Sequence, residues 1–456
     1  MASPQYDYDL VVIGAGSGGL SAARKAAELG KRVAIAEKAD IGGTCVNRGC
    51  IPTKLMIYAA QFAKQQKVAG SYGWVNPEGL FDWDDFKQSM DDYIQSLRKT
   101  QTENLDGIEL VRGQAEFVDA HTLKVGEKTV TTDFVLISVG ARPLMPDIPG
   151  IEHALDSRDI FKLETLPEKI VVAGGGYIGV EFSQILRSFG CQVVLVDSHP
   201  RVLNTFDADI QKRIQQILLD DKIQVIDDTR LKEITICDTE GDNSDDQGTE
   251  QILCAHLDDG QTIEAEQILC ALGRKANIDT LNLDAVAVIK KKNKIVVNQH
   301  SQTETPNIYA VGDCTAKMLL TPVARAEATL AVEAMFSDKE PHVDYQWVPS
   351  AVFMHPEVAT VGVTERDARD RYPQIEVHSN AFTPLKYAIA PDSPESFIKL
   401  VVNAETQQIL GVHLISPRAA DIIQSLVPAL KKGLTKAELD ATIGIHPSIG
   451  EEVFAL

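Results

Sequence analysis

Residues 9–19 of the chain read DLVVIGAGSGG, and this stretch decides the fold. The apolar run Asp9–Ile13 is typical of a buried β-strand, and the spaced glycines after it suit a tight turn into a helix. An alanine-rich helical stretch follows, and then a second apolar run, Val33–Ala36, ends at Glu37. A strand, glycine turn, helix and strand closed by an acid are the fingerprint of a dinucleotide-binding unit, in which the helix N-terminus holds the pyrophosphate.

The same pattern occurs again at residues 170–179, which read IVVAGGGYIG. A second helical stretch leads to Val193–Val196 and ends at Asp197, and in both copies the first glycine precedes the acid by 23 residues (14 to 37 and 174 to 197). One such motif is often only a tight turn, but two copies in the same setting indicate two bound dinucleotides. Two dinucleotides on one chain imply electron transfer between them, on an α/β fold with two Rossmann-like domains.

The composition narrows the class of protein. The chain has 456 residues, of which 44% are hydrophobic and 24% charged, so we expect a globular protein of two to four domains. With 44 basic and 65 acidic residues the net charge is −21, which argues against nucleic acid or an anionic membrane as a partner. No apolar run reaches the ~20 residues of a membrane span, and the start lacks a secretory signal. The sparse set of 7 cysteines is no disulfide scaffold, so we expect a soluble, cytoplasmic protein.

The remaining segments complete an outline of the chain. A helical region over about 53–104, interrupted by a loop near 70–79, precedes a β-rich stretch over about 108–140. Residues 238–250 contain 6 carboxylates, and we interpret them as a solvated hairpin loop. From about Val348, strands and helices without a glycine fingerprint predict a separate C-terminal domain.

Two of the cysteines, Cys45 and Cys50, lie close together in the sequence. On a regular α-helix this spacing rotates them about 140° apart and separates them by about 7.5 Å along the axis, whereas a disulfide needs Cα atoms about 4.4–6.8 Å apart. The segment must therefore be irregular if the two bond, and Gly49 permits that. A zinc site would need two more ligands, and the sequence has no second Cys-Cys or Cys-His pair at finger spacing. A redox-active pair and a pair of structural cysteines both remain open.

The segment around these cysteines, GGTCVNRGCIPTK at residues 42–54, resembles the FAD-dependent pyridine nucleotide–disulfide oxidoreductases. That family includes glutathione reductase, dihydrolipoamide dehydrogenase and mercuric reductase. Residues 305–313, TPNIYAVGD, are similar to its second flavin motif, and residues 446–451, HPSIGE, to its C-terminal motif. The resemblance covers the whole chain, and the scaffold is most similar to glutathione reductase. It implies an FAD-binding domain (1–150, with a return segment 276–345), an NAD(P)-binding domain (151–275) and a C-terminal α+β dimerisation domain (346–456).

The resemblance also implies a route for the electrons. NAD(P)H reduces the flavin, the flavin reduces the Cys45–Cys50 disulfide, and the resulting dithiol reduces an external disulfide. Cys50 would be the thiol next to the flavin, and Cys45 the interchange thiol. His446 would be the base that stabilises the thiolate and protonates the leaving thiol, while Glu451 orients its ring. In the family this histidine comes from the partner subunit, so the resemblance implies a homodimer.

Cofactor contacts are carried over position by position. Lys54 would lie near the flavin and pair with Glu181, Tyr177 would cover the nicotinamide pocket, and Asp313 would hold the ribityl chain. The resemblance implies no resident metal. The residues expected at FAD are Gly14, Gly16, Ser17, Gly18, Gly19, Glu37, Lys38, Gly43, Thr44, Cys45, Lys54, Gly140, Gly312 and Asp313. The residues expected at NAD(P) are Gly174, Gly176, Tyr177, Ile178, Gly179, Glu181, Asp197 and Gly273.

The choice of nucleotide can be argued from residues near the second closing acid. NADP enzymes need cations for the 2′-phosphate, whereas NAD enzymes place an acid on the 2′-hydroxyl. Asp197 would repel a 2′-phosphate, and the two arginines of glutathione reductases are replaced by Ser198 and Asn204. The third glycine, Gly179, is typically alanine in NADP members. We therefore expect NADH, while two nearby basic residues keep NADPH possible, namely His199 and Arg201.

The substrate is less well defined by the sequence. Arg24 matches an arginine that contacts glutathione in glutathione reductases, but a tyrosine position reads Gln101 and a second arginine position reads Thr329. Glutathione disulfide would lose two partners there, so a different disulfide stays plausible. Dihydrolipoamide dehydrogenase fits the expected NADH preference, but its resemblance to the C-terminal half of the chain is weaker.

Three alternatives have a different chemistry. A mercuric or other metal-ion reductase is one, but no cysteine follows Cys314, whereas mercuric reductases usually carry a pair near the C-terminus. An NADH oxidase or diaphorase, which passes electrons to oxygen or a quinone, is the second. A structural subunit that merely retains FAD is the third, and the presence of every catalytic position argues against it.

Overall fold

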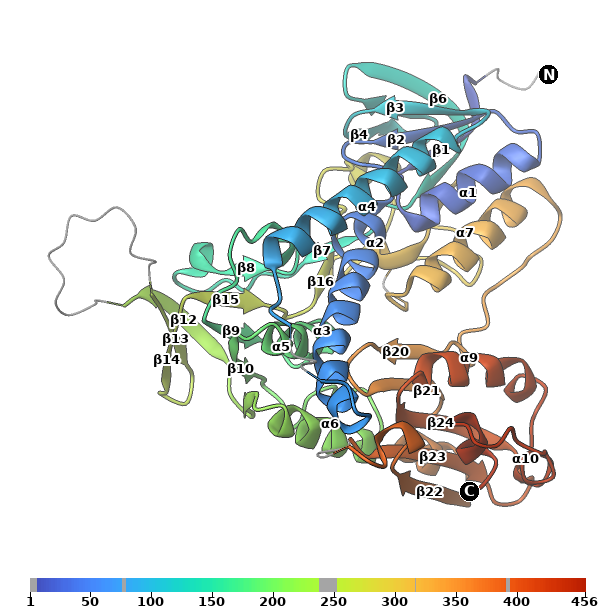
Figure 1. Cartoon of the computed structure of the whole chain (residues 1–456). Helices are drawn as coiled ribbons and strands as arrows, with labels where there is room; N and C mark the ends of the chain where they lie inside the picture. The colour runs from blue at the N-terminus through green and yellow to red at the C-terminus, as the bar shows by residue number, and fades with distance from the viewer. Residues whose placement is uncertain (1–5, 76–78, 238–251, 316, 391–393) are drawn as a thin grey trace, which may run out of the picture. The chain divides into compact units, whose positions relative to one another are not determined.

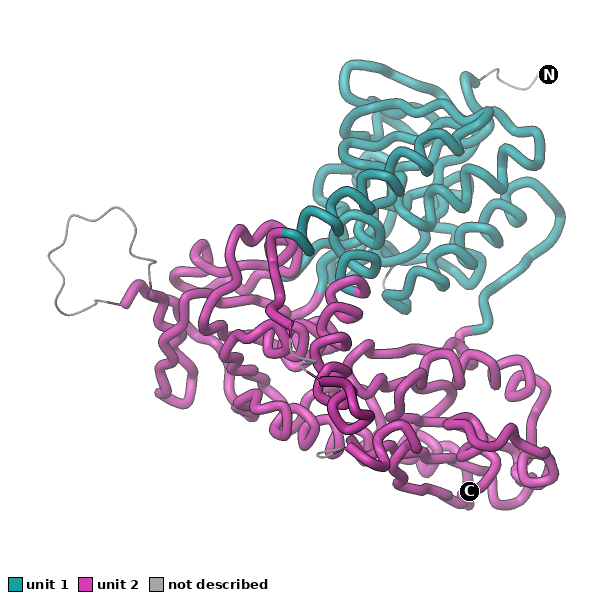
Figure 2. The backbone as a smooth tube through the Cα atoms, in the orientation of Figure 1, with its two compact units in different colours: residues 1–53, 85–144, 274–344 teal, residues 54–84, 145–273, 345–456 magenta. Residues whose placement is uncertain are grey.

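The computed structural model describes residues 6–75, 79–237, 252–315, 317–390 and 394–456 (Figure 1). The expected acidic loop at 238–250 lies outside the described residues. The chain divides into two compact units (Figure 2): unit 1 comprises residues 1–53, 85–144 and 274–344, and unit 2 comprises residues 54–84, 145–273 and 345–456. Residues 54–84, which we expected in the FAD-binding domain, thus group with unit 2. No helix among the described residues is both long and apolar enough to cross a bilayer.

Unit 1 is built on a largely parallel sheet with the strand order β3-β2-β1-β6-β5-β4, and β19 pairs with the free side of β6. Helices α1 and α7 pack against each other and against this sheet through alanine-rich faces. The strands are β1 (Tyr8–Ile13), β2 (Val33–Glu37), β3 (Ile108–Arg112), β4 (Ala115–Asp119), β5 (Thr122–Val125), β6 (Lys128–Ile137) and β19 (Ile308–Ala310), with the short pairs β7 (Ala141–Pro143) and β16 (Arg274–Ala276), and β17 (Lys290–Lys291) and β18 (Lys294–Ile295). The helices are α1 (Ser17–Glu28), α2 (Gly43–Arg48) and α7 (Thr321–Phe336), and α4 (Trp83–Glu103) lies mostly in this unit.

The first half of unit 2 repeats this plan with a parallel sheet in the order β11-β10-β9-β15-β8. A second, antiparallel sheet, β12-β13-β14, packs its apolar face on β9 and β10. The strands are β8 (Leu155–Asp156), β9 (Lys169–Ala173), β10 (Gln192–Val196), β11 (Gln224–Ile226), β12 (Leu231–Ile236), β13 (Leu253–Leu257), β14 (Thr262–Ala265) and β15 (Gln267–Cys270). The helices are α5 (Tyr177–Ser188) and α6 (Ala208–Asp220), together with α3 (Cys50–Ser71), which begins in unit 1.

The second half of unit 2 is an antiparallel sheet in the order β20-β21-β24-β23-β22, covered by α9. Strands β23 and β24 are apolar and buried along nearly their whole length, as expected of central strands covered on both faces. The strands are β20 (Ser350–Val352), β21 (Glu357–Gly362), β22 (Ile375–Phe382), β23 (Ser396–Asn403) and β24 (Ile409–Ser416). The helices are α8 (Glu365–Arg371), α9 (Ala419–Leu430) and α10 (Lys436–Asp440).

A buried lysine on β23 forms ion pairs with acidic residues from both halves of unit 2. The Lys399 side chain is 1% exposed, and its ammonium group lies 2.8 Å from Asp207, 2.6 Å from Asp209 and 2.7 Å from Glu365. Burial by itself would lower the pKa of Lys399, but the hydrogen bonds to these carboxylates raise it above its usual value, so the side chain stays charged. Asp207 also caps α6, which links the lysine to the start of that helix.

Replacing Lys399 with methionine is expected to destabilise the protein by about 3 kcal/mol, because the substitution leaves the carboxylate of Asp207, which is 2% exposed, without its buried counter-charge. The measurement is the urea midpoint of the flavin-loaded protein, with the exposed Lys432→Met variant as the control. A Lys399→Met midpoint equal to that of the control would contradict the proposed role of the charge cluster.

Candidate active site

The two glycine-rich turns have the same backbone geometry. Gly14 and Gly174 adopt φ values of 104° and 113°, which side chains rarely tolerate. A Cβ atom on Gly19 would lie 1.9 Å from the carbonyl oxygen of Gly14, and one on Gly179 would lie 1.8 Å from that of Gly174. The first glycine of each motif therefore makes the turn, and the third lets the helix pack directly on it, as the fingerprint predicts.

Each glycine-rich turn ends at the N-terminus of a helix. The N-cap residues of α1 and α5 are Gly16 and Gly176, and neither helix start has a side-chain cap among the described residues. The N–H groups at a helix N-terminus can bind an anion, which the helix dipole also attracts. A Cβ atom on Gly43 would lie 2.7 Å from Gly16 Cα, so the two loops meet backbone to backbone. This cradle fits the pyrophosphate of FAD at α1.

Each closing acid accepts hydrogen bonds from its own glycine turn. Glu37 accepts from the N–H groups of Ala15 and Ala39, both at 2.7 Å. Asp197 accepts from the N–H of Gly175 and, at 2.7 Å, from that of His199, whose ring Nδ1 lies 2.9 Å from the same carboxylate. The negative charge of Asp197 is therefore fixed at the end of β10.

The cysteine pair lies at a break between two helices, the irregularity that the spacing argument requires if the two are to bond. Helix α2 ends at Arg48, Gly49 adopts φ −157° and ψ −120°, and α3 begins at Cys50. A Cβ atom on Gly49 would approach the carbonyl oxygen of Thr44 to 2.9 Å. Cys45 is half-buried and Cys50 exposed, and both are free thiols in this structure.

Hydrogen bonding makes the two thiols unequal. The pKa of Cys45 is lowered to about 6, chiefly by a hydrogen bond from Cys50, with smaller contributions from the hydroxyls of Thr321 and Ser17 and the charge of Arg325, against the effect of burial. The pKa of Cys50 is raised, chiefly because its thiol donates to Cys45, and also because the negative charge on Cys45 disfavours a second thiolate beside it. The pair therefore shares one proton near neutral pH, and Cys45 carries the thiolate that a nucleophile needs.

Thr321 gives a direct test of this arrangement. Its Oγ1 lies 3.7 Å from Cys50 Sγ, and its hydroxyl also stabilises Cys45. Thr321→Val should raise the pKa of Cys45, because the hydroxyl that stabilises the thiolate is lost. The thiolate fraction then falls at pH 6 but not at pH 9, so alkylation of the reduced enzyme by iodoacetamide should slow about fivefold at pH 6 only. Thr321→Ser keeps the hydroxyl and should behave as wild type. Equal pH profiles for the valine and serine variants would contradict this role.

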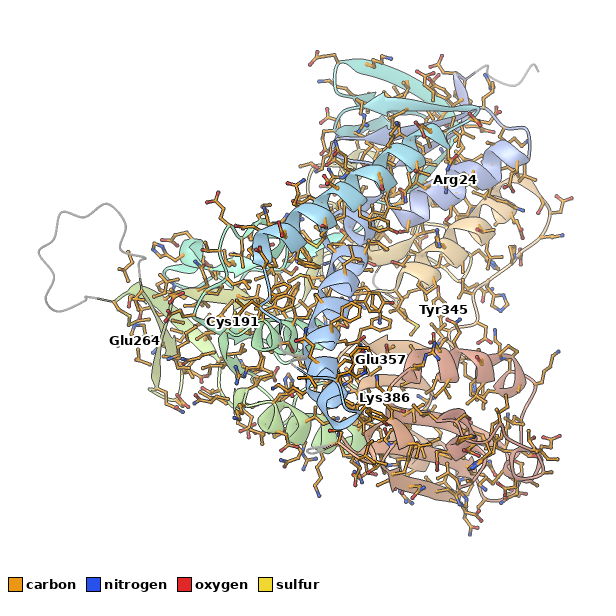
Figure 3. All side chains as sticks on the ribbon, in the orientation of Figure 1. Arg24, Cys191, Glu264, Tyr345, Glu357 and Lys386 are labelled. Atoms are coloured by element: carbon orange, nitrogen blue, oxygen red, sulfur yellow. A yellow bond between two sulfur atoms is a disulfide. The ribbon has the colours of Figure 1, made fainter. Side chains whose placement is uncertain are left out.

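Lys54 differs from expectation in its partner. Its ammonium group donates to Glu357 at 3.2 Å and lies 3.7 Å from the ring centre of Phe353, instead of pairing with Glu181 (Figure 3 labels Glu357). Glu181 is 8% exposed and accepts the N–H of Phe353 at 2.7 Å. Burial raises the pKa of Glu181 to about 7, opposed by that N–H and by the charge of Lys54. Lys54 thus pairs with Glu357, whose side chain is 14% exposed, and not with the more deeply buried Glu181.

The expected flavin motif near the end of unit 1 is held by a buried ion pair. Arg274 lies 3.5 Å from Asp313, and its side chain is 8% exposed. Burial raises the pKa of Asp313, and the nearby guanidinium opposes that shift. The N–H of Gly312 donates to the buried Glu327 of α7 at 2.7 Å. These contacts fix the turn that carries the acid expected at the ribityl chain.

The structure brings His446 and Glu451 together at the chain end. The His446 Nδ1 atom lies 3.0 Å from the Glu451 carboxylate, which also accepts the N–H of Ser448. The His446 side chain is 83% exposed, so its Nε2 is open to a reaction partner. Both residues line a groove of about 1890 Å³ within unit 2, whose walls include Phe62 and Trp74.

The remaining predicted residues occupy turns and helix starts. Gly140, Gly273 and Gly312 have positive φ angles of 64°, 117° and 72°. Lys38 follows β2 and is exposed, Thr44 lies on α2, and Tyr177 and Ile178 begin α5. Sequence reasoning missed several residues that contact the predicted ones, namely Arg274, Thr321, Arg325, Phe353 and Glu357. Only Thr321 had a local signal, because the proline after it is typical of a helix start.

Comparison with protein families gives matches along nearly the whole chain. The family model described as pyridine nucleotide-disulphide oxidoreductase matches residues 8–328. The model described as the dimerisation domain of the same group matches residues 348–455. The first match covers both glycine-rich turns and the cysteine pair, and the second covers His446 and Glu451.

Several curated relatives and a solved structure are similar over most or nearly all of their length. The chain is 38% identical to a glutathione reductase of Nostoc sp., with 98% of each chain covered, and 36% identical to one of Burkholderia cepacia, with 99% of each covered. It is 36% identical to the chloroplastic/mitochondrial glutathione reductase of Pisum sativum, covering 98% of this chain and 82% of that one. The HOCl-induced flavoprotein disulfide reductase RclA from Escherichia coli has a TM-score of 0.86 at 27% identity, covering 98% and 99% of the two chains.

Proposed function

Because the chain belongs to the pyridine nucleotide-disulphide oxidoreductases, we propose that it uses NADH to reduce a low-molecular-weight disulfide, with glutathione disulfide as the first substrate to test. Membership makes the chain an FAD-dependent oxidoreductase that acts on disulfides with NAD(P)H. NADH and the particular disulfide are the proposed part. We expect it to work in a reducing compartment such as the cytoplasm, since sparse cysteines suit that setting.

The fixed carboxylate of Asp197 is the observation that carries the nucleotide proposal. Its oxygens are held by the N–H groups of Gly175 and His199, so it cannot swing away from a phosphate at the end of β10. A 2′-phosphate there would meet a like charge, whereas a 2′-hydroxyl can donate to it. A Cβ atom at Gly179 would lie 1.8 Å from the carbonyl oxygen of Gly174, so the turn has no room for the alanine that is typical of NADP members. NADPH remains the alternative, and the relatives named above are glutathione reductases.

The surroundings of Cys45 favour an anionic disulfide with few fixed contacts. Arg325 lies close enough to lower the pKa of Cys45, and Arg24 is on α1 with no ion-pair partner among the described residues (Figure 3). Thr329 donates to the carbonyl oxygen of Arg325, and Gln101 packs near Gly42, where its Oε1 atom has no hydrogen-bond partner among the described residues. Neither offers a charge to a glycine carboxylate, so we expect a high KM for glutathione disulfide.

The residues present can complete the exchange chemistry. Bound FAD would supply the two-electron reduction of the Cys45–Cys50 disulfide. The Cys45 thiolate then attacks the external disulfide and forms a mixed disulfide, and the first thiol leaves with a proton. Cys50 attacks Cys45 within the mixed disulfide, which restores the internal disulfide and releases the second thiol. We propose that the partner subunit's His446 donates the proton to the leaving thiol. The carboxylate of Glu451 would orient its imidazole ring through the contact with Nδ1 that is seen within this chain.

The direct test of the function is a matrix of steady-state turnover: NADH or NADPH against glutathione disulfide, lipoamide and mercuric ion. The proposal predicts a kcat/KM for NADH at least about tenfold above that for NADPH, a difference of about 1.4 kcal/mol, with a disulfide as acceptor. A preference for NADPH would overturn the nucleotide assignment. Turnover with mercuric ion but no disulfide would favour the metal-ion reductase alternative.

The homodimer can be tested with two inactive variants. A mixed dimer of one His446→Gln chain and one Cys45→Ser chain contains one site with an intact cysteine pair and an intact histidine. Such dimers, purified with two different tags, should recover disulfide turnover that neither parent shows. Mixed dimers with full flavin content and no turnover would contradict a histidine supplied across the interface.

A further inference from the structure

A second cysteine pair lies in unit 2, whereas Cys45 and Cys50 belong to unit 1. Cys237 follows β12, Cys254 is on β13, and the two form a disulfide with Cα atoms 5.4 Å apart. Cys254 lies opposite Thr235, two residues before Cys237, so both sulfurs project from the same face of the sheet. The N–H of Cys237 donates to the carbonyl oxygen of Ile252 at 2.9 Å, so the backbone holds the pair in register even without the covalent bond.

A carboxylate from a third strand faces this pair. Glu264 on β14 lies directly opposite Cys254, and one of its oxygens and the two sulfurs are all within 4.8 Å of one another (Figure 3 labels Glu264). The cysteines are half-buried and the glutamate is exposed. The neighbouring His256 is not available as a ligand, because Thr235 and Thr262 occupy its two ring nitrogens at 2.8 and 2.9 Å.

This arrangement changes its chemistry on reduction. An external dithiol can open the disulfide: it gives up two electrons and two protons, becomes a cyclic disulfide, and leaves thiols on Cys237 and Cys254. Two thiolates beside the Glu264 carboxylate would repel one another, which a divalent cation would relieve. Zinc bonds of about 2.3 Å to sulfur and 2.0–2.2 Å to oxygen require the sulfurs to part to about 3.7 Å. Rotation of the two cysteine side chains can supply that change, and the 5.4 Å between the Cα atoms of Cys237 and Cys254 need not alter.

We propose that Cys237, Cys254 and Glu264 form a redox-gated site for a thiophilic divalent cation such as Zn²⁺. In the disulfide form the sulfurs carry no charge and the site is closed. In the dithiol form the two thiolates and the carboxylate bind the ion, with water as the fourth ligand, and two protons are released. The site is on the polar face of the β12-β13-β14 sheet, whose opposite face packs on β9 and β10.

The experiment uses the flavin-loaded protein carrying Cys45→Ser and Cys50→Ser, so that the active-site thiols cannot bind the probe. One sample is reduced with a dithiol that is then removed without oxygen, and another stays oxidised. Zn²⁺ is titrated into each against a chromophoric chelator. The reduced sample should bind one Zn²⁺ per chain with release of two protons, and the oxidised sample none. Glu264→Gln in the reduced protein should weaken binding about tenfold or more, and Cys254→Ser about a hundredfold or more.

Several results would overturn the proposal. Zinc binding of equal strength in the oxidised form, or in reduced Cys254→Ser, would place the ion elsewhere. Unchanged affinity in Glu264→Gln would remove the third ligand. Failure of the dithiol to expose Cys237 and Cys254 to alkylation, read by peptide mass, would leave the site permanently closed. Flavin content and the thermal midpoint of each variant show that the fold is retained, and Glu264→Asp, which keeps a carboxylate, should retain more affinity than Glu264→Gln.

Discussion

Replacing Cys45 with serine should lower kcat for disulfide reduction by at least about 10⁴-fold, because the hydroxyl cannot form the mixed disulfide. The thiolate of Cys45 is favoured by its hydrogen bond from Cys50, and no other described thiol has a lowered pKa. The same variant should keep NADH oxidation with ferricyanide, since that acceptor needs no thiol. The measurement is the ratio of the two activities in one preparation.

A cysteine outside the site provides the control. Cys237→Ser removes the disulfide of unit 2 and should retain wild-type turnover with both acceptors. If Cys45→Ser kept disulfide turnover, the pair would be structural. If wild type reduced only ferricyanide, oxygen or a quinone, the diaphorase alternative would be favoured.

Introducing two arginines should redirect the nucleotide preference. In the double variant Ser198→Arg with Asn204→Arg, each guanidinium can make a charge-assisted hydrogen bond to a 2′-phosphate, at about 1.5–3 kcal/mol each. We expect kcat/KM for NADPH to rise by about 10²-fold or more while that for NADH changes little. Ser198 follows Asp197 directly, so the new charge would also offset the carboxylate that we hold responsible for selecting NADH.

The matched control carries glutamine at the same two positions, which adds length without charge. Its kcat/KM for NADPH should stay low, and the gain in the arginine variant should shrink as salt screens the contact. A wild-type enzyme that already prefers NADPH, or equal gains in the arginine and glutamine variants, would contradict the role given to charge at this edge.

The local features of the fold could be predicted from the sequence. The strands expected over Asp9–Ile13 and Ile170–Ala173 are observed as β1 and β9, each one residue longer at its start. The helix break that a Cys45–Cys50 disulfide would require lies at Gly49. Strand runs, glycine turns and helix geometry depend on neighbouring residues, and a single sequence contains that information.

Contacts between distant residues could not be predicted in the same way. Lys54 pairs with Glu357, which follows it by 303 residues, and the choice over Glu181 depends on how deeply each carboxylate is buried. The Cys237–Cys254 disulfide was also not predicted. The composition argues only against a disulfide scaffold, and a sequence spacing of 17 residues does not show how the strands that place the two cysteines pair. Burial and strand register arise from packing, which spacing along the chain does not contain.

The most direct test of the central claim is a count of thiols before and after anaerobic addition of one equivalent of NADH to the air-oxidised enzyme, by alkylation and peptide mass. If the account holds, alkylation appears at Cys45 and Cys50, while the buried Cys191 and Cys270 stay as they were. Oxidation of NADH without new labelling at Cys45 and Cys50 would contradict it, because the electrons would then bypass the pair on which the proposed function depends.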